Sequence, residues 1–304
     1  MPAKVSLEAI RTYDPEAVLA AMRRVLAPLG GMEAFVQPGQ KVLLKPNLLG
    51  AFSPDEAVTT HPSVVRAATI LVQEAGGKVA IGDSPGTGEL KAALRRSGIG
   101  AVAAELGADI ADFQASAEVE REENIVGRRL ALAQAVTDAD VVITLPKLKT
   151  HAQMGFTCAL KNQFGLIVGT EKALWHYRLQ DRDWLGALMI DINQLARPAL
   201  AIVDAIVGME GHGPSGGDPR EIGALIAGLP FDEAARADPT LVQCYDEARG
   251  VLHQSRIDDC TGRAVSESEA ATIRATLKAK RLQRLRQAMK PKEERNKGRR
   301  GHGT

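Results

Sequence analysis

Residues 141–162 read VVITLPKLKTHAQMGFTCALKN and carry the pattern from which the fold is predicted. The first five residues, Val141 to Leu145, are mostly β-branched and nearly free of polar groups. Such a run is typical of a strand that is buried on both faces of a parallel sheet, and Pro146 ends it. The segment therefore predicts an α/β protein with an open, mostly parallel sheet flanked by helices.

The residues after Pro146 are abruptly polar. If the chain stays extended there, Lys147, Lys149 and His151 alternate along it, and their side chains point to one side. Ligands of open α/β sheets bind in the crevice outside the carboxyl ends of the strands. We therefore expect these three residues to be the catalytic candidates of an anion site. A solvated basic loop is the alternative interpretation.

Three other apolar runs, at 41–44, 78–81 and 199–203, are predicted to be buried strands of the same sheet. Polar side chains follow each of them at once, and these are Lys45, Asn47, Asp83, Ser84 and Asp204. Right-handed crossovers bring all carboxyl ends of a parallel sheet to one edge. We therefore expect the polar groups to share one crevice, where a lysine or histidine near carboxylates suits acid/base work or the binding of a carboxylate or phosphate.

Further candidates come from helix starts and glycine-rich turns. His61 precedes a predicted helix at 62–75, where free N–H groups favour an anion, although a capping histidine explains it equally simply. Lys161 and Asn162 follow an apolar segment. His212 lies in the glycine-rich stretch 207–218, which permits close backbone approach to a ligand but also suits a mobile loop.

The turn at 82–88, GDSPGTG, resembles a phosphate loop at first sight. Its spacing matches neither the dinucleotide nor the nucleoside-triphosphate motif, and a tight strand-to-helix turn explains it as well. The sequence therefore leaves the cofactor open.

Charge is unevenly distributed along the 304 residues, although the net charge is only +1. Residues 278–300 contain eleven Lys or Arg against two Glu, which is about +9, so the first 277 residues carry about −8. We expect an α/β domain at 1–228, a divergent connecting segment at 229–265, and a basic helix with a disordered tail at 266–304. The basic tail predicts weak, salt-sensitive contact with nucleic acid.

Cysteine usage and the amino terminus indicate a cytosolic protein. The three cysteines, Cys158, Cys244 and Cys260, are far apart, and no C-x-x-C pair indicates a disulfide framework, a zinc site or a cluster. The first residues, MPAKVSLEAIRTY, lack the apolar segment of a signal peptide. No apolar stretch is long enough to predict a membrane span, so we expect no membrane partner.

Four segments in order resemble a known family: KVLLKPNLL, THPSVVRAATILVQEAGGKVAIGDSPG, DADVVITLPKLKTHAQMGFTCALKN and ALAIVDAIVGMEGHGP. They are similar to the domain-of-unknown-function family three hundred and sixty-two, from about residue 41 to 228. Many of its members are labelled iron–sulfur cluster-binding because of a fused ferredoxin-like segment with four cysteines, which this sequence lacks. The sequence also departs from the family pattern at 229–233.

The sequence is compatible with three functions. The first is a cytosolic enzyme, or an enzyme-like subunit, that binds a small anionic metabolite at the carboxyl ends of the strands. The second, implied by the resemblance, is a redox or iron–sulfur-associated protein that acts with a cluster-bearing partner, because scattered cysteines supply no conventional four-cysteine site. The third is a nucleic-acid-binding protein that uses the basic tail.

Overall fold

The computed structural model describes residues 5–122, 124, 126–169, 171–179 and 182–228. The predicted connecting segment 229–265 and the predicted basic helix and tail 266–304 lie outside these residues. The domain boundaries and the role of the tail therefore stay predictions. Cys244 and Cys260 also lie outside the described residues.

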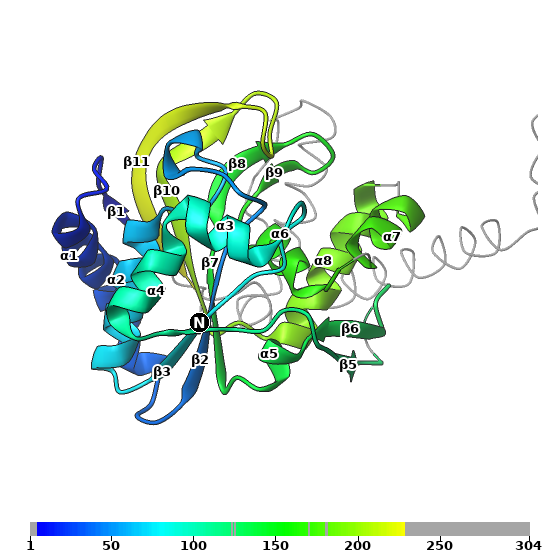
Figure 1. Ribbon diagram of the computed structural model, residues 1–304, viewed down its shortest axis with the longest axis horizontal. Coiled ribbons are helices and arrows are strands. Elements are labelled where there is room, and N and C mark those ends of the chain that lie inside the picture. The colour runs from blue at the N-terminus through cyan, green and yellow to red at the C-terminus, as the bar shows by residue number, and fades with distance from the viewer. Residues whose placement is uncertain (1–4, 123, 125, 170, 180–181, 229–304) are drawn as a thin grey trace, which may run out of the picture. The chain divides into compact units, whose positions relative to one another are not determined.

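A mixed, mostly parallel sheet forms the centre of the described region, which confirms the predicted α/β class (Figure 1). Its strands follow the order β1-β11-β10-β7-β2-β3-β4, and β8 and β9 extend it from β10. Pairing is parallel from β10 through β7, β2 and β3 to β4, and antiparallel among β1, β11 and β10. The strands are β1 (Val5–Ala9), β2 (Lys41–Pro46), β3 (Lys78–Ile81), β4 (Asp109–Ile110), β7 (Val141–Leu145), β8 (Lys147–His151), β9 (Gly155–Thr157), β10 (Leu200–Glu210) and β11 (Asp218–Gly228).

Helices cover both faces of the sheet (Figure 1). One core contains apolar residues of α1, α2, α3 and α4, and the other contains residues of α8 and of the small β5–β6 hairpin. The helices are α1 (Pro15–Leu26), α2 (Pro62–Glu74), α3 (Leu90–Ser97), α4 (Ile99–Leu106), α5 (Gln134–Thr137), α6 (Ala159–Asn162), α7 (Glu171–Arg178) and α8 (Arg182–Ala196). The hairpin strands are β5 (Ser116–Glu120) and β6 (Arg129–Ala133).

The two cores follow from the alternation of side chains along the central strands. In β2, Val42 and Leu44 face the core of α1 and α2, whereas Leu43 faces the core of α8. All five residues of β7 are buried, as the apolar run at 141–145 predicts. These two strands therefore form the middle layer of a three-layer arrangement.

Strand β10 is longer than the sequence predicts. The sequence predicts a strand at 199–203, but β10 continues to Glu210 and contains Asp204 in its interior. Antiparallel pairing with β11, interrupted by an irregularity between Ala205 and Val207, holds this extension in place. Much of the expected glycine-rich loop is therefore strand, and a short turn at 211–217 joins β10 to β11.

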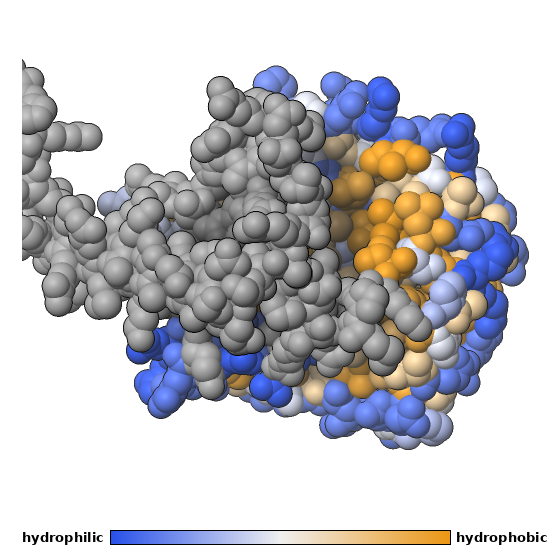
Figure 2. Space-filling model, turned by 180° about the vertical axis from the view of Figure 1, so that it is seen from behind, coloured by the Kyte–Doolittle hydropathy of each residue, from blue (hydrophilic) through white to orange (hydrophobic). Residues whose placement is uncertain are grey.

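The outer strands expose apolar side chains. Val5 and Leu7 of β1 and Ile222 of β11 are exposed. Figure 2 shows hydrophobic residues gathered on the side of the molecule turned away from the viewer in Figure 1. The large apolar side chains are therefore buried at the central strands of this sheet and partly exposed at its antiparallel edge.

The difference between central and edge positions can be tested with two leucines. Leu44→Ala removes a fully buried side chain of β2 and is expected to lower the free energy of unfolding by about 2–5 kcal/mol. Leu7→Ala changes a side chain that is 64% exposed and is expected to cost less than about 0.5 kcal/mol. Urea unfolding followed by circular dichroism measures both. Similar losses for the two variants would contradict this account of the core.

Candidate functional site

The topology sets the carboxyl ends of β2 and β7 side by side, and the region outside these ends is where the sequence predicts a crevice. These neighbouring strands continue in opposite directions, because β2 leads through α2 to β3 and β7 leads through α8 to β10. The two connecting helices pack on opposite faces of the sheet. Such a switch point is where open α/β sheets bind ligands. The polar residues that follow β2, β3 and β7 lie at this edge.

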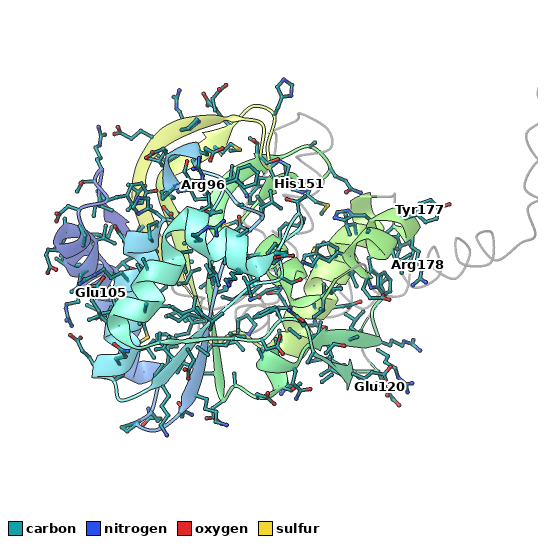
Figure 3. The ribbon with its side chains drawn as sticks, viewed as in Figure 1. Arg96, Glu105, Glu120, His151, Tyr177 and Arg178 are labelled. Atoms are coloured by element: carbon teal, nitrogen blue, oxygen red, sulfur yellow. The ribbon has the colours of Figure 1, made fainter. Side chains whose placement is uncertain are left out.

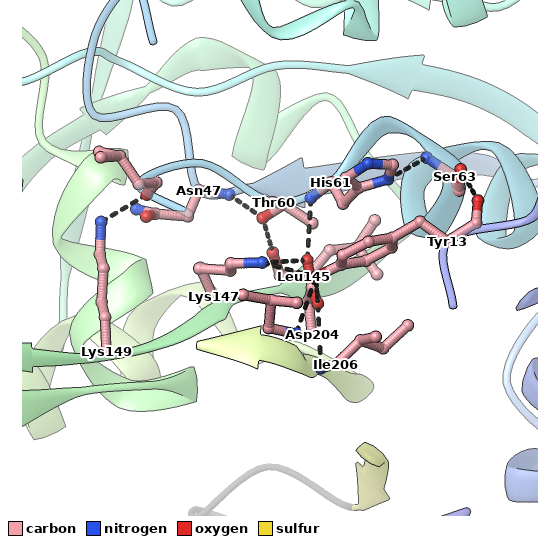
Figure 4. A network of polar contacts seen from close by, with 12 residues as sticks. Tyr13, Asn47, Thr60, His61, Ser63, Leu145, Lys147, Lys149, Asp204 and Ile206 are labelled. Carbon is pink, nitrogen blue, oxygen red and sulfur yellow. Dashed lines mark hydrogen bonds and ion pairs between the residues drawn. The ribbon is translucent and has the colours of Figure 1, made fainter. Parts of the chain in front are cut away.

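A buried ion pair joins β8 to β10 in this crevice (Figure 4). Lys147 and Asp204 are register partners, and Lys147 Nζ lies 2.9 Å from Asp204 Oδ2. Their side chains are 1% and 0% exposed. Because a buried charge without a partner is costly, the pair requires a close and fully bonded geometry.

Two further groups, the Tyr13 hydroxyl and the His61 backbone N–H, bond this pair (Figure 4). The Tyr13 hydroxyl donates to Asp204 Oδ1 at 2.8 Å and lies 2.8 Å from Lys147 Nζ. The His61 backbone N–H donates to Asp204 Oδ2 at 2.9 Å. Burial and the neighbouring Asp204 charge raise the pKa of Tyr13. The tyrosine therefore stays protonated and serves as a donor to the carboxylate.

A second buried ion pair links β2 to the turn after β3. Lys45 Nζ lies 2.8 Å from Asp83 Oδ1, and the backbone amides of Leu48 and Ser84 also donate to Asp83. Gly165 lies directly against this pair, because a Cβ at that position would overlap Asp83 Oδ1 and lie 2.8 Å from Lys45 Nζ. Burial lowers the pKa of Lys45, and the Asp83 charge opposes that change.

Three more lysines, Lys149, Lys161 and Lys172, contribute positive charge without forming an ion pair among the described residues. Lys149 Nζ donates to the carbonyl of Val58 at 2.6 Å. Lys172 Nζ donates to the carbonyls of Ser84 and Pro85. Lys161 Nζ lies over the ring of Phe164, 4.7 Å from its centroid. Carbonyls and a ring face stabilise an ammonium but do not neutralise it.

The pKa values of these three lysines are lowered chiefly by burial. The pKa of Lys149 falls to about 7, with the charges of Lys161 and Lys147 as further causes. The pKa of Lys161 falls to about 8, and Lys45 and Lys172 contribute to that change. The pKa of Lys172 also falls to about 8. When all five lysines are protonated, the two aspartates leave an excess of three positive charges, which an anion would compensate.

The histidines of the crevice are neutral at pH 7. Burial and the nearby Lys161 lower the pKa of His151 to about 3, and its Nδ1 accepts the backbone amides of Gln153 and Met154. The predicted row of three cations in β8 therefore consists of two lysines and a neutral imidazole. Burial also lowers the pKa of His61 to about 4.

His61 has the capping position that was the alternative interpretation of the sequence. Its Nδ1 accepts the backbone N–H of Ser63 at the start of α2, and its ring stacks on Tyr13 at 3.6 Å between centroids. His212 lies exposed in the turn between β10 and β11. Among the described residues, no hydrogen bond or ion pair joins the His212 side chain to the lysines.

Helix α7 contributes a histidine, His176, that is not among the site residues predicted from the sequence. His176 Nδ1 lies 3.0 Å from Gln153 Oε1, and burial lowers its pKa. Figure 3 shows His151 beside the β8–β9 end of the sheet, and Tyr177 and Arg178 on the outer side of α7. One side of this helix therefore approaches the crevice, and the other faces away from it.

Two predicted asparagines lie among the polar groups at the carboxyl ends of β2 and β7. Asn162 Nδ2 donates to the carbonyl of Lys45 at 3.1 Å and to Thr144 Oγ1 at 2.8 Å. Asn47 donates its backbone N–H to Thr60 Oγ1. The side-chain oxygens of both asparagines are buried without a hydrogen-bond partner within the described part of the chain, as are both amide atoms of Gln163. Buried polar atoms are normally bonded, so these atoms are available to a ligand or water.

Sequence reasoning missed Tyr13, Gly165 and Lys172, which the fold brings to the crevice. Tyr13 follows β1, and Lys172 lies in the first turn of α7, so neither comes after a parallel strand. Gly165 resembles any other glycine in an apolar segment. A pattern based on strand ends has no signal for these residues, because they approach from neighbouring layers.

Two kinds of feature, a metal-ligand cluster and a membrane-spanning helix, are absent among the residues that the structure describes. Among them, no three His, Cys, Asp or Glu side chains gather as they would around a metal ion. None of the helices in this part of the chain combines the length and apolar character needed to cross a membrane. Cys158 is a free thiol whose pKa burial raises to about 11.

These features define an α/β domain with a lysine-rich crevice at the switch point of its sheet. Residues 42–231 match the model of the family described as "Domain of unknown function (DUF362)", and the chain belongs to that family. A thylakoid-associated protein of Synechocystis sp. is 41% identical over 228 residues, which cover 75% of this chain and 70% of that protein.

A solved structure with a similar arrangement is that of the lactate racemase apoprotein from Thermoanaerobacterium thermosaccharolyticum. The sequence identity is 12% and the TM-score is 0.43. The match covers 74% of this chain and 54% of that one, so this chain spans about half the length of the racemase.

The buried pair in β8 and β10 can be tested by removing one charge. Asp204→Asn keeps the size of the side chain but leaves the Lys147 ammonium without its counter-charge, so we expect a loss of about 3–5 kcal/mol in unfolding free energy. Lys147→Met/Asp204→Asn removes both charges and is expected to be more stable than Asp204→Asn alone. Urea unfolding measures each variant.

A control for this experiment lies on the same strand. Glu210→Gln removes the exposed ion pair with Arg220, whose closest atoms are 3.6 Å apart. Exposed pairs contribute little, so we expect a change of at most about 1 kcal/mol. An Asp204→Asn variant as stable as Glu210→Gln would contradict the structural role of the buried pair.

Proposed function

We propose that this protein is an enzyme, or an enzyme-like subunit, that binds a small anionic metabolite at the carboxyl ends of its parallel strands. The observation that carries the proposal is the group formed by Lys149, Lys161 and Lys172. These lysines lie near one another at the carboxyl ends of the strands, and Lys149 and Lys172 are buried while Lys161 is half-buried. None of them has a carboxylate partner among the described residues. A carboxylate or phosphate supplies the missing negative charge and accepts their hydrogen bonds.

The two ion pairs have a different role in this proposal. Asp204 and Asp83 already neutralise Lys147 and Lys45, so these lysines act chiefly as fixed supports for the crevice. Asn47 and Asn162 add side-chain atoms for a polar group of the ligand. Sites that hold their polar groups in place before the ligand arrives avoid the cost of ordering them on binding.

Lys149 is the residue best suited to proton transfer. Its pKa of about 7 allows the ammonium and the neutral amine to coexist near neutral pH. As an ammonium it donates a proton or a hydrogen bond, and as an amine it accepts a proton. His151 adds an imidazole that stays neutral at the same pH. The reaction class that we propose is therefore acid/base chemistry on a carboxylated or phosphorylated metabolite.

Binding of the anion can be tested by thermal stabilisation. Inorganic phosphate at 100 times its Kd is expected to stabilise the folded protein by about 2.7 kcal/mol, and carboxylated and phosphorylated metabolites are screened beside it. Lys149→Met and Lys161→Met each remove one donor and are expected to weaken binding about tenfold or more. Differential scanning fluorimetry and titration calorimetry provide the two measurements.

The matched control is Lys78→Met, which alters an exposed lysine at the start of β3, away from the carboxyl ends. Its affinity for phosphate should equal that of the wild type. If Lys149→Met and Lys161→Met bound phosphate as well as Lys78→Met does, the lysine crevice would not be the anion site.

The pH dependence of binding follows from the lowered lysine pKa values. Lysines are charged below their pKa, so the positive charge of the crevice is present at pH 6 and is lost as the pH rises through about 7 to 8. We expect the affinity for sulfate, whose charge is constant over this range, to fall between pH 6 and pH 9. Calorimetric titration at a series of pH values measures the fall, and an affinity that is flat across the range would contradict the assignment.

A further inference from the structure

A large cavity lies at the same sheet edge, beside the lysine crevice. It occupies about 1120 Å³ outside the carboxyl ends of β3 and β4, between these ends and helices α3 and α4. Cavities that bind small molecules are typically about 300–1,000 Å³, so this one has room for a ligand of more than a few atoms. Lys149, Lys161 and Lys172 are not among the residues that line it.

The wall of the cavity is mainly apolar. Leu90 and Leu94 of α3 face it from one side, and Ile110, Phe113 and Val168 contribute from the others. Ile110 is 45% exposed even though the structure buries most of its large apolar side chains. An exposed apolar surface within a concave site favours an apolar ligand group, because binding removes that surface from water.

The charges at the cavity balance one another. Lys91 and Arg95 of α3 line it together with Glu89 and Asp112, and all four residues are exposed. A fifth charged residue, Asp83, is already paired with Lys45 outside the cavity lining. The cavity therefore has no excess positive charge of its own, and an anionic group is attracted more strongly to the neighbouring lysines.

The turn after β3 separates the cavity from the lysine crevice and belongs to both. Asp83 lines the cavity and also bonds Lys45, and Ser84 lines the cavity and also accepts a hydrogen bond from Lys172. Pro85, the second carbonyl partner of Lys172, lines the cavity as well. The positive charge and the apolar wall are therefore separated by a single turn of the backbone.

We propose that the ligand of this protein is an amphipathic anion, with its charged group at the lysines and an apolar body in the cavity between α3 and β4. The inference rests on the proposed function for the charged group and adds a second binding region for the rest of the molecule. Under this inference, Ile110 and the α3 leucines select ligands by the apolar part of the molecule.

The experiment uses inorganic phosphate and the series ethyl, butyl and hexyl phosphate, with the full-length protein, in titration calorimetry. Phosphate alone measures the lysine crevice. Each added methylene that enters the cavity is expected to raise the affinity up to about fourfold. The affinity of the wild-type protein should therefore increase steadily along the series.

Variants of α4 and β4 test whether the alkyl chain binds in the cavity or on another apolar surface. Ala101→Trp places a large ring in the cavity from an exposed helix position, and should remove the dependence on chain length while leaving phosphate affinity unchanged. Ile110→Ser should weaken hexyl phosphate several-fold without altering phosphate. Ala104→Trp, an exposed position of α4 that does not line the cavity, is the matched control and should behave as the wild type.

The outcomes distinguish the two proposals. If phosphate binds but affinity does not increase along the alkyl series, or if the increase persists in Ala101→Trp, the proposed role of the cavity would be wrong. The proposal of an anion site at the lysines would stand. Absence of phosphate binding to the wild type would contradict the proposed function and this inference together. Steady improvement with chain length that is lost in Ala101→Trp and kept in Ala104→Trp would support both.

Discussion

The buried pair between Lys147 and Asp204 is the constraint on which the rest of the site depends. An ammonium and a carboxylate cannot both be withdrawn from water unless they are paired and their remaining bonds are satisfied. Here that condition joins β8 to β10, and brings Tyr13 and the start of α2 at His61 to the same carboxylate. Segments far apart in the chain thereby acquire fixed positions around the Asp204 carboxylate at the carboxyl ends of the strands.

The second pair, between Lys45 and Asp83, extends the same arrangement across the sheet and explains the unusual state of the other lysines. With both aspartates already engaged, Lys149, Lys161 and Lys172 have only carbonyls and a ring as described partners. Burial then favours their neutral forms, whereas a bound anion favours their charged forms. The excess positive charge of these lysines therefore affects both the stability of the crevice and its affinity for an anion.

In this sheet, charged and apolar side chains gather at the ends of different strands. The switch point at β2 and β7 collects charge, because polar residues follow both strands there. The neighbouring ends of β3 and β4 instead meet the apolar faces of α3 and α4.

The sequence by itself determined the sheet class, the central strands and the polar residues that follow them, because apolar periodicity and strand ends are local properties. It left β1 and β11 unrecognised and ended β10 at Val203, since antiparallel pairing between distant segments decides those strands. The tertiary structure alone decided which lysines are neutralised, because ion pairing depends on distances across the fold. It also decided that His151 is neutral and that Tyr13, Gly165 and Lys172 belong to the site. The spacing of residues along the sequence does not predict their burial or their contacts between layers.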